Sequence, residues 1–439
     1  MDVPATGATP VLARIDIADD PPAAYPLAGR GGLMVGMLLL VNIVNFVDRQ
    51  LPFILIGSIK KDLLLSDAQI GLMAGLTFAI VYSVAALPLA HAADRWSPRW
   101  VLVLSLATWS GMTALSGLAQ TFTQLVFGRI GVAASEAGCT PSAHALIVRI
   151  IAPRRRALAL ALFSIGVPIG STLGLILGGW INDVADWRTA FFVVGLPGLG
   201  LALLAWLILP KLPGTEVAGS VAPPGFGATL HRLFALRSFR YMAAGSAFYS
   251  SGSYAINVFA PAFLMRVHGL TASQAGLRMG IVFGVGGLIG TFVGGVLADR
   301  LARRDEAWRQ YLPAIGQWVS LPLGVGAWLA PDLNVATALL ATSYMMGLLY
   351  FAPTFAAVQS LVPDRIRATA SAVLLFCLTI VGSSVGPLVV GWLSDLLTPR
   401  FGALSLRYAL CSMAVTMALS GISFQLAGRS LAGDIRRSI

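Results

Sequence analysis

Charged residues are scarce in this chain. Only 11% of its 439 residues are Lys, Arg, Asp or Glu, whereas soluble proteins carry about 25%. Hydrophobic residues make up 57%, and the mean hydropathy is +0.80. A soluble protein of this size needs a polar shell that so few charges cannot supply. The composition therefore disfavours a soluble enzyme, a nucleic-acid-binding protein and a disordered chain, and it indicates an integral membrane protein.

The chain also has few of the residues that catalysis and metal binding require. Cys139, Cys377 and Cys411 lie far apart in apolar segments, so we expect them to pack rather than to form disulfides or bind zinc. The four histidines are scattered without an H-E-x-x-H motif, and no G-x-S-x-G motif occurs. None of the three lysines lies in a G-x-x-x-x-G-K-[ST] motif. We therefore expect no enzyme, no ATP-driven pump, no metal and no cofactor.

Positive charge outweighs negative charge, with a formal net charge of +11. In a membrane protein the Lys and Arg content of the loops sets the orientation. Most of the arginines lie in the two tails, in a central linker and in alternate loops between apolar segments. This pattern predicts that both termini and the linker face the cytoplasm, and that nucleic acid is not a partner. We expect a multi-pass protein of a bacterial inner membrane.

Twelve apolar segments of membrane-spanning length follow one another. The first six lie at about 31–58, 67–91, 100–119, 123–150, 156–181 and 187–209. The other six lie at about 239–266, 272–297, 309–329, 334–361, 366–396 and 403–428. The sequence thus predicts an all-α integral membrane fold with twelve transmembrane helices in two pseudo-symmetric six-helix bundles. Ten or fourteen spans are the alternatives.

These segments divide the chain into five parts. We predict a disordered cytoplasmic tail at 1–29, an N-terminal six-helix bundle at 30–209, a cytoplasmic linker at 210–238, a C-terminal six-helix bundle at 239–428 and a cytoplasmic tail at 429–439. Proline and glycine make a continuous helix through the linker impossible. Its stretch HRLFALRSFR has the pattern of a short basic amphipathic helix at the membrane surface.

The two halves of the chain resemble each other. The segment from PRRRALALALFSIG to GGWINDV matches the later one from PDRIRATASAVLLF to VGWLSDLL. Trp180 and Asp183 each have an equivalent 212 positions later, at Trp392 and Asp395. The loop HAADRWSPRW likewise matches VLADRLARR. Tandem repeats of this kind are typical of transporters that move one half against the other.

The second of these loops, GGVLADRLARR, resembles the G-x-x-x-D-R-x-G-R-R loop of the major facilitator superfamily. Gly295, Asp299 and Arg300 match, as do the two arginines that follow, while Ala302 replaces the second glycine. The first copy matches less closely. Two such loops at equivalent places imply the twelve-helix fold of this superfamily and transport by alternating access.

The resemblance also implies gating contacts. Asp94 and Arg95 form the first copy of the loop, and in this superfamily that Asp meets the start of the eleventh helix, which carries Arg365 and Arg367 here. An anion at a helix N-terminus gains about 0.3–1 kcal/mol when exposed. The contact would close the cytoplasmic side. Loop charge that only sets orientation is the alternative, but it does not account for Asp94 and Asp299.

Three further segments, NFVDRQ, FGRIGVAASEAGCTPSAHAL and RRRALALALFSIGVPIGSTLG, resemble the spinster family. Its members have an Asp-Arg pair in helix 1 and a pattern close to R-x-x-x-G-x-G-E-A-S in helix 4. Asp48, Arg49, Arg129 and Glu136 occupy those positions, whereas Ser135 replaces the glycine before the Glu. The resemblance implies export or exchange of lysolipid- or sphingolipid-like amphiphiles, driven by protons.

Four ionisable residues lie deep in the predicted spans. Asp48 and Arg49 interrupt the first apolar segment. Arg129 and Glu136 lie seven residues apart in the fourth, which puts both on one helix face at about 10 Å from each other. A charge at the centre of a lone membrane helix costs about 2.5–3.5 kcal/mol, so these four groups are expected to pair around a water-filled cavity. A permanent cluster that only fixes helix packing is the alternative.

We hypothesise that Glu136, with Asp48, takes up and releases a coupling proton. Its protonation would free Arg129 or Arg49 to bind an anionic group on the cargo. The expected driving force is the proton gradient, and the expected partners are protons, the lipid bilayer and an amphiphilic or anionic small molecule bound by a monomer.

Other polar residues are candidates for the cavity lining. They are His144, Tyr249, Tyr254, Asn257, Arg278, Tyr344 and Tyr350. His144 either relays protons or is an ordinary buried histidine. Arg278 and Arg407 either line the cavity or extend to the membrane interface. For the tyrosines and Asn257, packing in the core or at the interface is the alternative.

Two other functions are compatible with the sequence. One is a proton-coupled carrier of another organic anion or drug-like compound. The other is a non-transporting membrane sensor of the same fold.

Overall fold

Helices account for nearly all of the described chain. The computed structural model describes residues 30–212, 226–363 and 366–438, and no strand occurs among them. Seven helices in these ranges are long and apolar enough to cross a membrane. The last of them, Thr369–Arg436, is a run of several successive helices with 68 residues in total. One crossing needs about 20 residues, so this run is longer than a single span.

The first half of the chain forms α1 to α8. Its elements are α1 (Gly31–Leu63), α2 (Asp67–Gly71), η3 (Leu72–Thr77), α3 (Phe78–Arg95), α4 (Pro98–Ser116), α5 (Phe122–Glu136), α6 (Cys139–Ile150), α7 (Pro153–Val184) and α8 (Trp187–Ile208). The π-helical η3 joins α2 to α3 without a break. The two-residue gap between α5 and α6 follows Glu136 directly.

The second half forms α9 to α18. Its elements are α9 (Phe226–Ala235), α10 (Arg237–His268), α11 (Ala272–Ala302), α12 (Trp308–Leu329), α13 (Leu333–Gly347), η4 (Leu348–Tyr350), α14 (Phe351–Ser360), α15 (Arg367–Cys377), η6 (Leu378–Gly382), α16 (Ser383–Phe401), η7 (Gly402–Leu404), α17 (Ser405–Cys411) and α18 (Met413–Ser438). The π-helical η6 lies between α15 and α16, much as η3 lies between α2 and α3.

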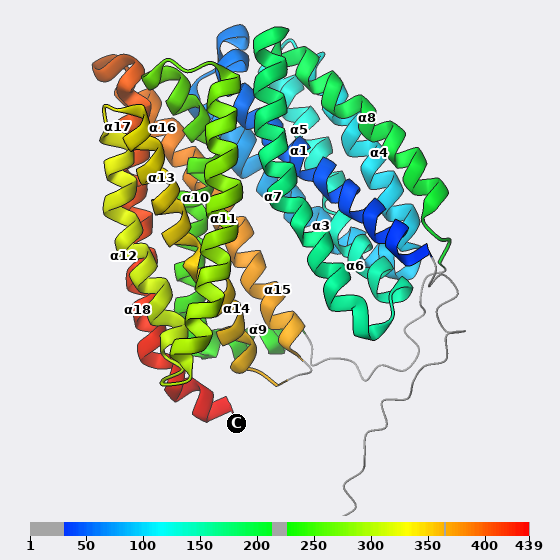
Figure 1. Cartoon of the computed structure of the whole chain (residues 1–439), viewed down its shortest axis with the longest axis vertical. Helices are drawn as coiled ribbons and strands as arrows, with labels where there is room; N and C mark the ends of the chain where they lie inside the picture. Colours follow the sequence, from blue (N-terminus) through cyan, green and yellow to red (C-terminus); the bar gives the residue numbers. More distant parts are fainter. Residues whose placement is uncertain (1–29, 213–225, 364–365, 439) are drawn as a thin grey trace, which may run out of the picture.

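Figure 1 shows the two halves as two groups of helices that lie close together at the top of the view and diverge toward the bottom. The upper end of the molecule carries the starts of α2 and α11 and the ends of α7 and α16. The lower end carries the starts of α7 and α15 and the C-terminus. We use "upper end" and "lower end" in this sense below.

Two segments of the chain differ from the predicted boundaries. The predicted amphipathic stretch 231–240 is divided, because α9 ends at Ala235 and α10 begins at Arg237. Leu233 of α9 is fully buried against other helices of the second half. The predicted tail 429–439 is helical to Ser438, as a continuation of α18. The predicted tail 1–29 and linker residues 213–225 lie outside the described ranges.

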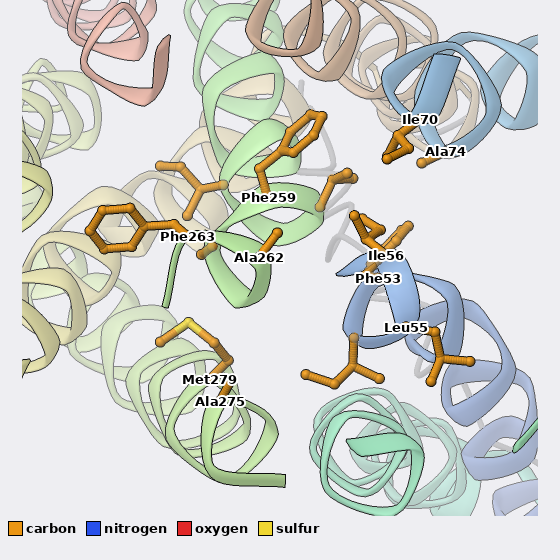
Figure 2. Close-up of a cluster of buried hydrophobic side chains, with 14 of the residues drawn as sticks. Phe53, Leu55, Ile56, Ile70, Ala74, Phe259, Ala262, Phe263, Ala275 and Met279 are labelled. Carbon is orange, nitrogen blue, oxygen red and sulfur yellow. The ribbon is translucent and has the colours of Figure 1, made fainter. Parts of the chain in front are cut away.

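The largest buried apolar cluster joins the two halves at the upper end. Phe53 and Ile56 of α1 belong to it together with Phe259 and Ala262 of α10, and all four are at most 2% exposed. Figure 2 shows residues of α1, α2 and η3 on one side of this cluster and residues of α10 and α11 on the other. Separate clusters fill the interior of each half toward the lower end. Apolar burial therefore holds the halves together at the upper end.

Glycines set how closely the helices of the first half approach. Gly166, Gly170 and Gly174 recur every four residues in α7 and face α1. A Cβ on Gly170 would lie 2.4 Å from the carbonyl oxygen of Ile43, and one on Gly174 would lie 2.7 Å from that of Val47. Small residues at this spacing allow backbones to pack closely in a membrane.

We predict that Gly170→Ala destabilises the protein by about 1–3 kcal/mol, because its methyl group has to displace the α1 backbone. Gly200→Ala in α8 is the matched control, since no atom lies within 4 Å of the added Cβ. Thermal unfolding of the purified variants in detergent measures the difference. Equal midpoints for Gly170→Ala and Gly200→Ala would show that the α1–α7 contact does not limit stability.

Candidate functional site

The charged residues of α1 and α5 form a buried ion pair. Nε of Arg49 donates to Oε2 of Glu136 at 2.7 Å. Glu136 is 1% exposed, whereas 22% of the Arg49 side chain is exposed. The pair therefore has an anion held in the interior and a cation that reaches solvent.

Asp48 has a different partner from the one expected. Oγ1 of Thr113, from α4, lies 2.7 Å from Oδ1 and 2.6 Å from Oδ2 of Asp48. Both residues are 1% exposed. None of the ion pairs among the described residues joins Asp48 to Arg129. In this conformation the four charges thus form one ion pair, and a hydroxyl group binds the remaining carboxylate.

Arg129 lies beside the pair and is 1% exposed. Its Nε and Nη2 atoms have no hydrogen-bond partner among the described residues, and neither does Oε1 of Glu136. Leaving a buried polar group unpaired costs about 1–3 kcal/mol, and more for a charge. The Arg129 nitrogens are therefore suited to donate to water or to a ligand group, and Oε1 of Glu136 is suited to bind water or a proton. The two side chains are also suited to pair with each other in a second conformation.

Aromatic rings surround the two guanidinium groups. Cζ of Arg49 lies 5.2 Å from the ring centroids of Phe46 and Phe78 and 4.6 Å from that of Tyr82. Cζ of Arg129 lies 4.9 Å from the Phe78 ring. Rings at these distances stabilise a cation in a site with little water. The site therefore combines positive charge with an apolar, polarisable wall.

The gap between α5 and α6 brings the site close to α4. A Cβ on Gly138 would lie 2.5 Å from Oγ of Ser105 in α4. A larger residue would have to displace the Ser105 hydroxyl group just after Glu136. Gly138 therefore allows close packing beside the charged site.

The tyrosines of the second half take different places. Tyr254 of α10 is partly exposed, and its ring meets Phe53 of α1 edge-on at 5.9 Å, at the boundary between the halves. Tyr249 and Tyr350 are 5% and 3% exposed, and their rings lie 4.7 Å apart inside the second half. Packing in the core thus accounts for this pair, while Tyr254 faces the first half.

A small, mainly apolar cavity lies within the second half. Its volume is about 10 Å³, and it is lined by Tyr249, Ser253, Ile256, Ser320, Leu340, Ser343, Tyr344 and Met417. A cavity of this size holds a single water molecule. It is too small for an amphiphilic cargo. Asn257 of α10 does not line it and is partly exposed.

Two other candidates lie away from the charged site. His144 of α6 packs edge-on against Phe163 at 5.5 Å. Arg278 of α11 donates from Nη1 to Oδ1 of Asn334 at 3.2 Å and to Oγ1 of Thr337 at 3.4 Å, near the upper end. None of the described hydrogen bonds connects His144 or Arg278 with Arg49 or Glu136.

Two aspartates join the halves at the upper end. Asp183, in the last turn of α7, accepts hydrogen bonds from the backbone N–H groups of Ala272 and Ser273 at 3.1 and 2.8 Å. Asp395 of α16 accepts from those of Asp67 and Ala68 at 2.9 and 2.7 Å. Each carboxylate thus caps the first turn of a helix in the other half. The sequence repeat pairs Asp183 with Asp395, but it does not reveal this role.

Asp67 adds an ionic contact to the same end. Nη1 and Nη2 of Arg266 donate to its two oxygens at 2.7 and 2.8 Å, and Nζ of Lys60 donates at 2.6 Å. Oγ of Ser394 donates to the same carboxylate at 2.8 Å. Asp67 is 1% exposed, so this contact excludes water. It links α1 and α2 of the first half with α10 and α16 of the second.

Four of the predicted gating residues, Asp94, Arg95, Asp299 and Arg300, are exposed at the lower end. None of the described ion pairs involves Asp94. Asp299 is 73% exposed and lies 3.9 Å from Arg309 of its own half. Arg365 lies outside the described residues, and Nε of Arg367 donates to the carbonyl oxygen of Gln359. The contact of Asp94 with the start of α15 therefore stays a prediction for another conformation.

Comparison with known proteins identifies the family. The profile of the Major Facilitator Superfamily matches residues 38–387. The chain belongs to the major facilitator superfamily. An MFS-type efflux pump of Mycolicibacterium smegmatis is 40% identical over 407 residues, which cover 92% of this chain and 94% of that protein. Protein spinster homolog 1 of Homo sapiens is 27% identical over 448 residues, with 93% and 83% of the two chains covered.

A solved structure shows to which group of the superfamily this chain is similar. The crystal structure of a bacterial homolog to the human lysosomal transporter Spinster, in an inward-facing and unoccupied conformation, matches with a TM-score of 0.84 and 27% identity. The match covers 92% of this chain and 98% of that one. The chain is thus a spinster-type membrane transporter of the superfamily, as the sequence resemblance predicts.

We predict that Asp183→Ala and Asp395→Ala each open the upper end of this transporter. Loss of a cap costs about 0.5–2 kcal/mol, so each change shifts the conformational equilibrium by roughly 2- to 30-fold. Spin labels on the exposed positions Leu64 and Leu404, in a variant without native cysteines, report the distance across the upper end.

Asp186→Ala is the control for both variants. Asp186 caps Thr189 within its own half at 2.6 Å, so its loss removes a cap without touching the boundary. An unchanged distance distribution in both Asp183→Ala and Asp395→Ala would contradict the assigned role.

Proposed function

We propose that this spinster-type protein is a proton-coupled secondary transporter that moves a lysolipid- or sphingolipid-like amphiphile across the membrane by alternating access. It has twelve spans in a bacterial inner membrane and acts as a monomer. Its lower end, with both termini and the linker, faces the cytoplasm.

The observation that carries this proposal is the buried pair of Arg49 and Glu136. The pair is neutral as a whole, which lowers the cost of two charges in the bilayer. A proton on Glu136 removes the anion and leaves Arg49 as an uncompensated cation. Because 22% of the Arg49 side chain is exposed, an anionic group on a cargo molecule can reach it. Proton binding and cargo binding are thus coupled through one guanidinium group.

The surroundings of Arg49 favour an amphiphile. An anionic headgroup would bind the guanidinium group, and the rings of Phe46, Phe78 and Tyr82 would contact the adjoining apolar part. Tyr254 extends this apolar wall from the second half. A cation with apolar walls on both halves suits a molecule with a small charged head and a hydrocarbon tail.

The contacts of the two ends support alternating access. The upper end is joined by the apolar cluster, the two aspartate caps and the Asp67 contact, while the helices of the two halves diverge toward the lower end. In the opposite state Asp94 would cap α15 near Arg367, and the upper contacts would separate. The similar structure is described as inward-facing, which favours the lower end as the cytoplasmic one.

Helix lengths support twelve spans. The run Thr369–Arg436, which covers most of α15 to α18, is long enough for two crossings. The 19-residue α4 and the 22-residue α12 extend over about 28 and 33 Å at 1.5 Å per residue, close to the thickness of a bilayer core. The 32-residue α10 and the segment formed by α5 and α6 are also long enough to cross, which brings the count to twelve.

A second candidate function is proton-coupled export of a drug-like compound or another organic anion. It is favoured by the relative at 40% identity, which is named an efflux pump. The same guanidinium group and rings would bind a planar anion as well as a lipid headgroup. A non-transporting sensor of this fold would bind the same ligands without flux.

We predict that Glu136→Gln abolishes uphill transport driven by an imposed pH gradient in proteoliposomes, because an amide cannot exchange the coupling proton. Downhill exchange of cargo should continue. Glu306→Gln is the matched control, since Glu306 forms a similar pair with Arg309 at 2.6 Å on the exposed surface. Uphill transport by Glu136→Gln at the wild-type rate would exclude Glu136 as the coupling group.

The cargo class is tested by thermal unfolding with lysophospholipids, sphingoid bases and organic anions. A ligand stabilises by RT ln(1 + [L]/Kd), or about 2.7 kcal/mol at 100 times its Kd. We expect lysophospholipids to raise the midpoint most, and counterflow of the labelled compound to follow. Saturable binding without counterflow would indicate the sensor. A larger shift with a drug-like anion would favour the second candidate.

A further inference from the structure

Two arginines of the second half converge on the turn between α12 and α13. Nη2 of Arg407, from α17, donates to the carbonyl oxygen of Ala330 at 3.5 Å. Nη1 of Arg278, from α11, donates to Oδ1 of Asn334 and Oγ1 of Thr337. Ala330 directly follows α12, and Asn334 lies in the first turn of α13. Side chains from two separate helices thus bring positive charge to one turn.

A third ionisable group lies against the same place. The ring of His268, at the end of α10, is 5.2 Å from that of Phe263, which is 5.1 Å from that of Trp328. Trp328 lies two residues before Ala330. Burial and the charges of Arg407 and Arg278 lower the pKa of His268, while Asp332 opposes them. The histidine therefore lies within electrostatic reach of both guanidinium groups and of the Asp332 carboxylate.

The two arginines of this cluster outnumber the one carboxylate, Asp332, that acts on His268 beside them. None of the ion pairs in the described ranges involves His268, Arg278 or Arg407. Oδ1 of Asp332 already accepts the N–H groups of Asn334 and Val335, both at 2.9 Å, as the cap of α13. Nε of Arg407 and Nε2 of His268 are buried without a hydrogen-bond partner in the described part of the chain. Nε of Arg407 can donate to an acceptor, and Nε2 of His268 can donate or accept according to its protonation.

The surroundings of the cluster are apolar and exposed. Leu329 is 47% exposed, Val335 51%, Leu404 39% and Tyr408 38%, and they lie on the same helices and turns as the cluster. Side chains of this kind at helix ends contact lipid. A group that binds here would therefore lie at the depth of lipid headgroups.

We propose that His268, Arg278 and Arg407 form a second binding site, separate from the charged site of the first half, for a phosphate group. Phosphate offers several acceptor oxygens, and the planar guanidinium group binds them in pairs. The source is either the headgroup of an anionic phospholipid or inorganic phosphate. The exposed apolar rim favours the headgroup.

The test is thermal unfolding of the full-length protein in a maltoside detergent. The probes are short-chain phosphatidylglycerol and, at constant ionic strength, inorganic phosphate. We expect phosphatidylglycerol to raise the midpoint in a saturable way. Arg278→Gln and Arg407→Gln should each weaken this effect about tenfold or more, as expected for loss of a charge-assisted hydrogen bond.

Arg400→Gln is the matched control. Arg400 is an exposed arginine of the same end that stacks on Phe401 at 5.4 Å and takes no part in the cluster. Its loss should leave binding unchanged. An equal response to inorganic phosphate would identify the free anion as the ligand, whereas a response to phosphatidylglycerol alone would identify the headgroup. The proposal would be overturned if neither probe gave a saturable shift of the midpoint. It would also be overturned if Arg400→Gln weakened the shift as much as Arg278→Gln and Arg407→Gln do.

A variant that fails to fold is replaced by Arg407→Lys, which keeps the charge but loses the paired geometry. Broadening of the phosphatidylglycerol signal in phosphorus NMR then reports binding to folded protein. We expect wild type to broaden the signal most, Arg407→Lys less, and the double variant Arg278→Lys/Arg407→Lys least. Equal broadening by all three would also overturn the proposal.

Discussion

The cost of an unpaired charge in hydrocarbon is the constraint on which this structure depends. A lone charge at the bilayer centre is expensive, so α1 and α5 can carry Arg49 and Glu136 only where each is near the other. The same constraint explains why Thr113 binds Asp48 from a third helix. It also gives the site its chemistry, because any proton or ligand that changes one member of the pair changes what the other has to bind.

At the upper end, short-range contacts of several kinds act together. Apolar side chains of α1 and α10 exclude water there, and Asp67 is bound by Lys60 and Arg266 inside the same closed region. Water exclusion strengthens these ionic contacts. Conversely, water that enters as the halves separate would weaken them and solvate the freed groups. Closure and opening of this end are therefore both cooperative.

Much of this arrangement follows from patterns that are local in the sequence. Hydropathy locates the helices, and the scarcity of charge points directly to Asp48, Arg49, Arg129 and Glu136. Thr113 carries no such signal, because a hydroxyl in an apolar helix is ordinary and its partner lies 65 positions away. The sequence also does not show that the rings of Phe78 and Tyr82 contact Arg49, because these residues are ordinary in an apolar helix and lie far from Arg49 along the chain. The tandem repeat marks Asp183 and Asp395, but only the packing of the two halves shows which helix each one caps.

The two aspartate caps have a geometric consequence. Asp183 joins α7 to α11, and Asp395 joins α16 to α2, so the caps belong to two separate seams between the halves. A hinge at either seam would leave that seam closed and the passage obstructed on one side. In the alternating-access cycle proposed above, opening of the upper end therefore requires both caps to break, and the motion that this implies is a rotation of the halves about an axis that passes between the two seams.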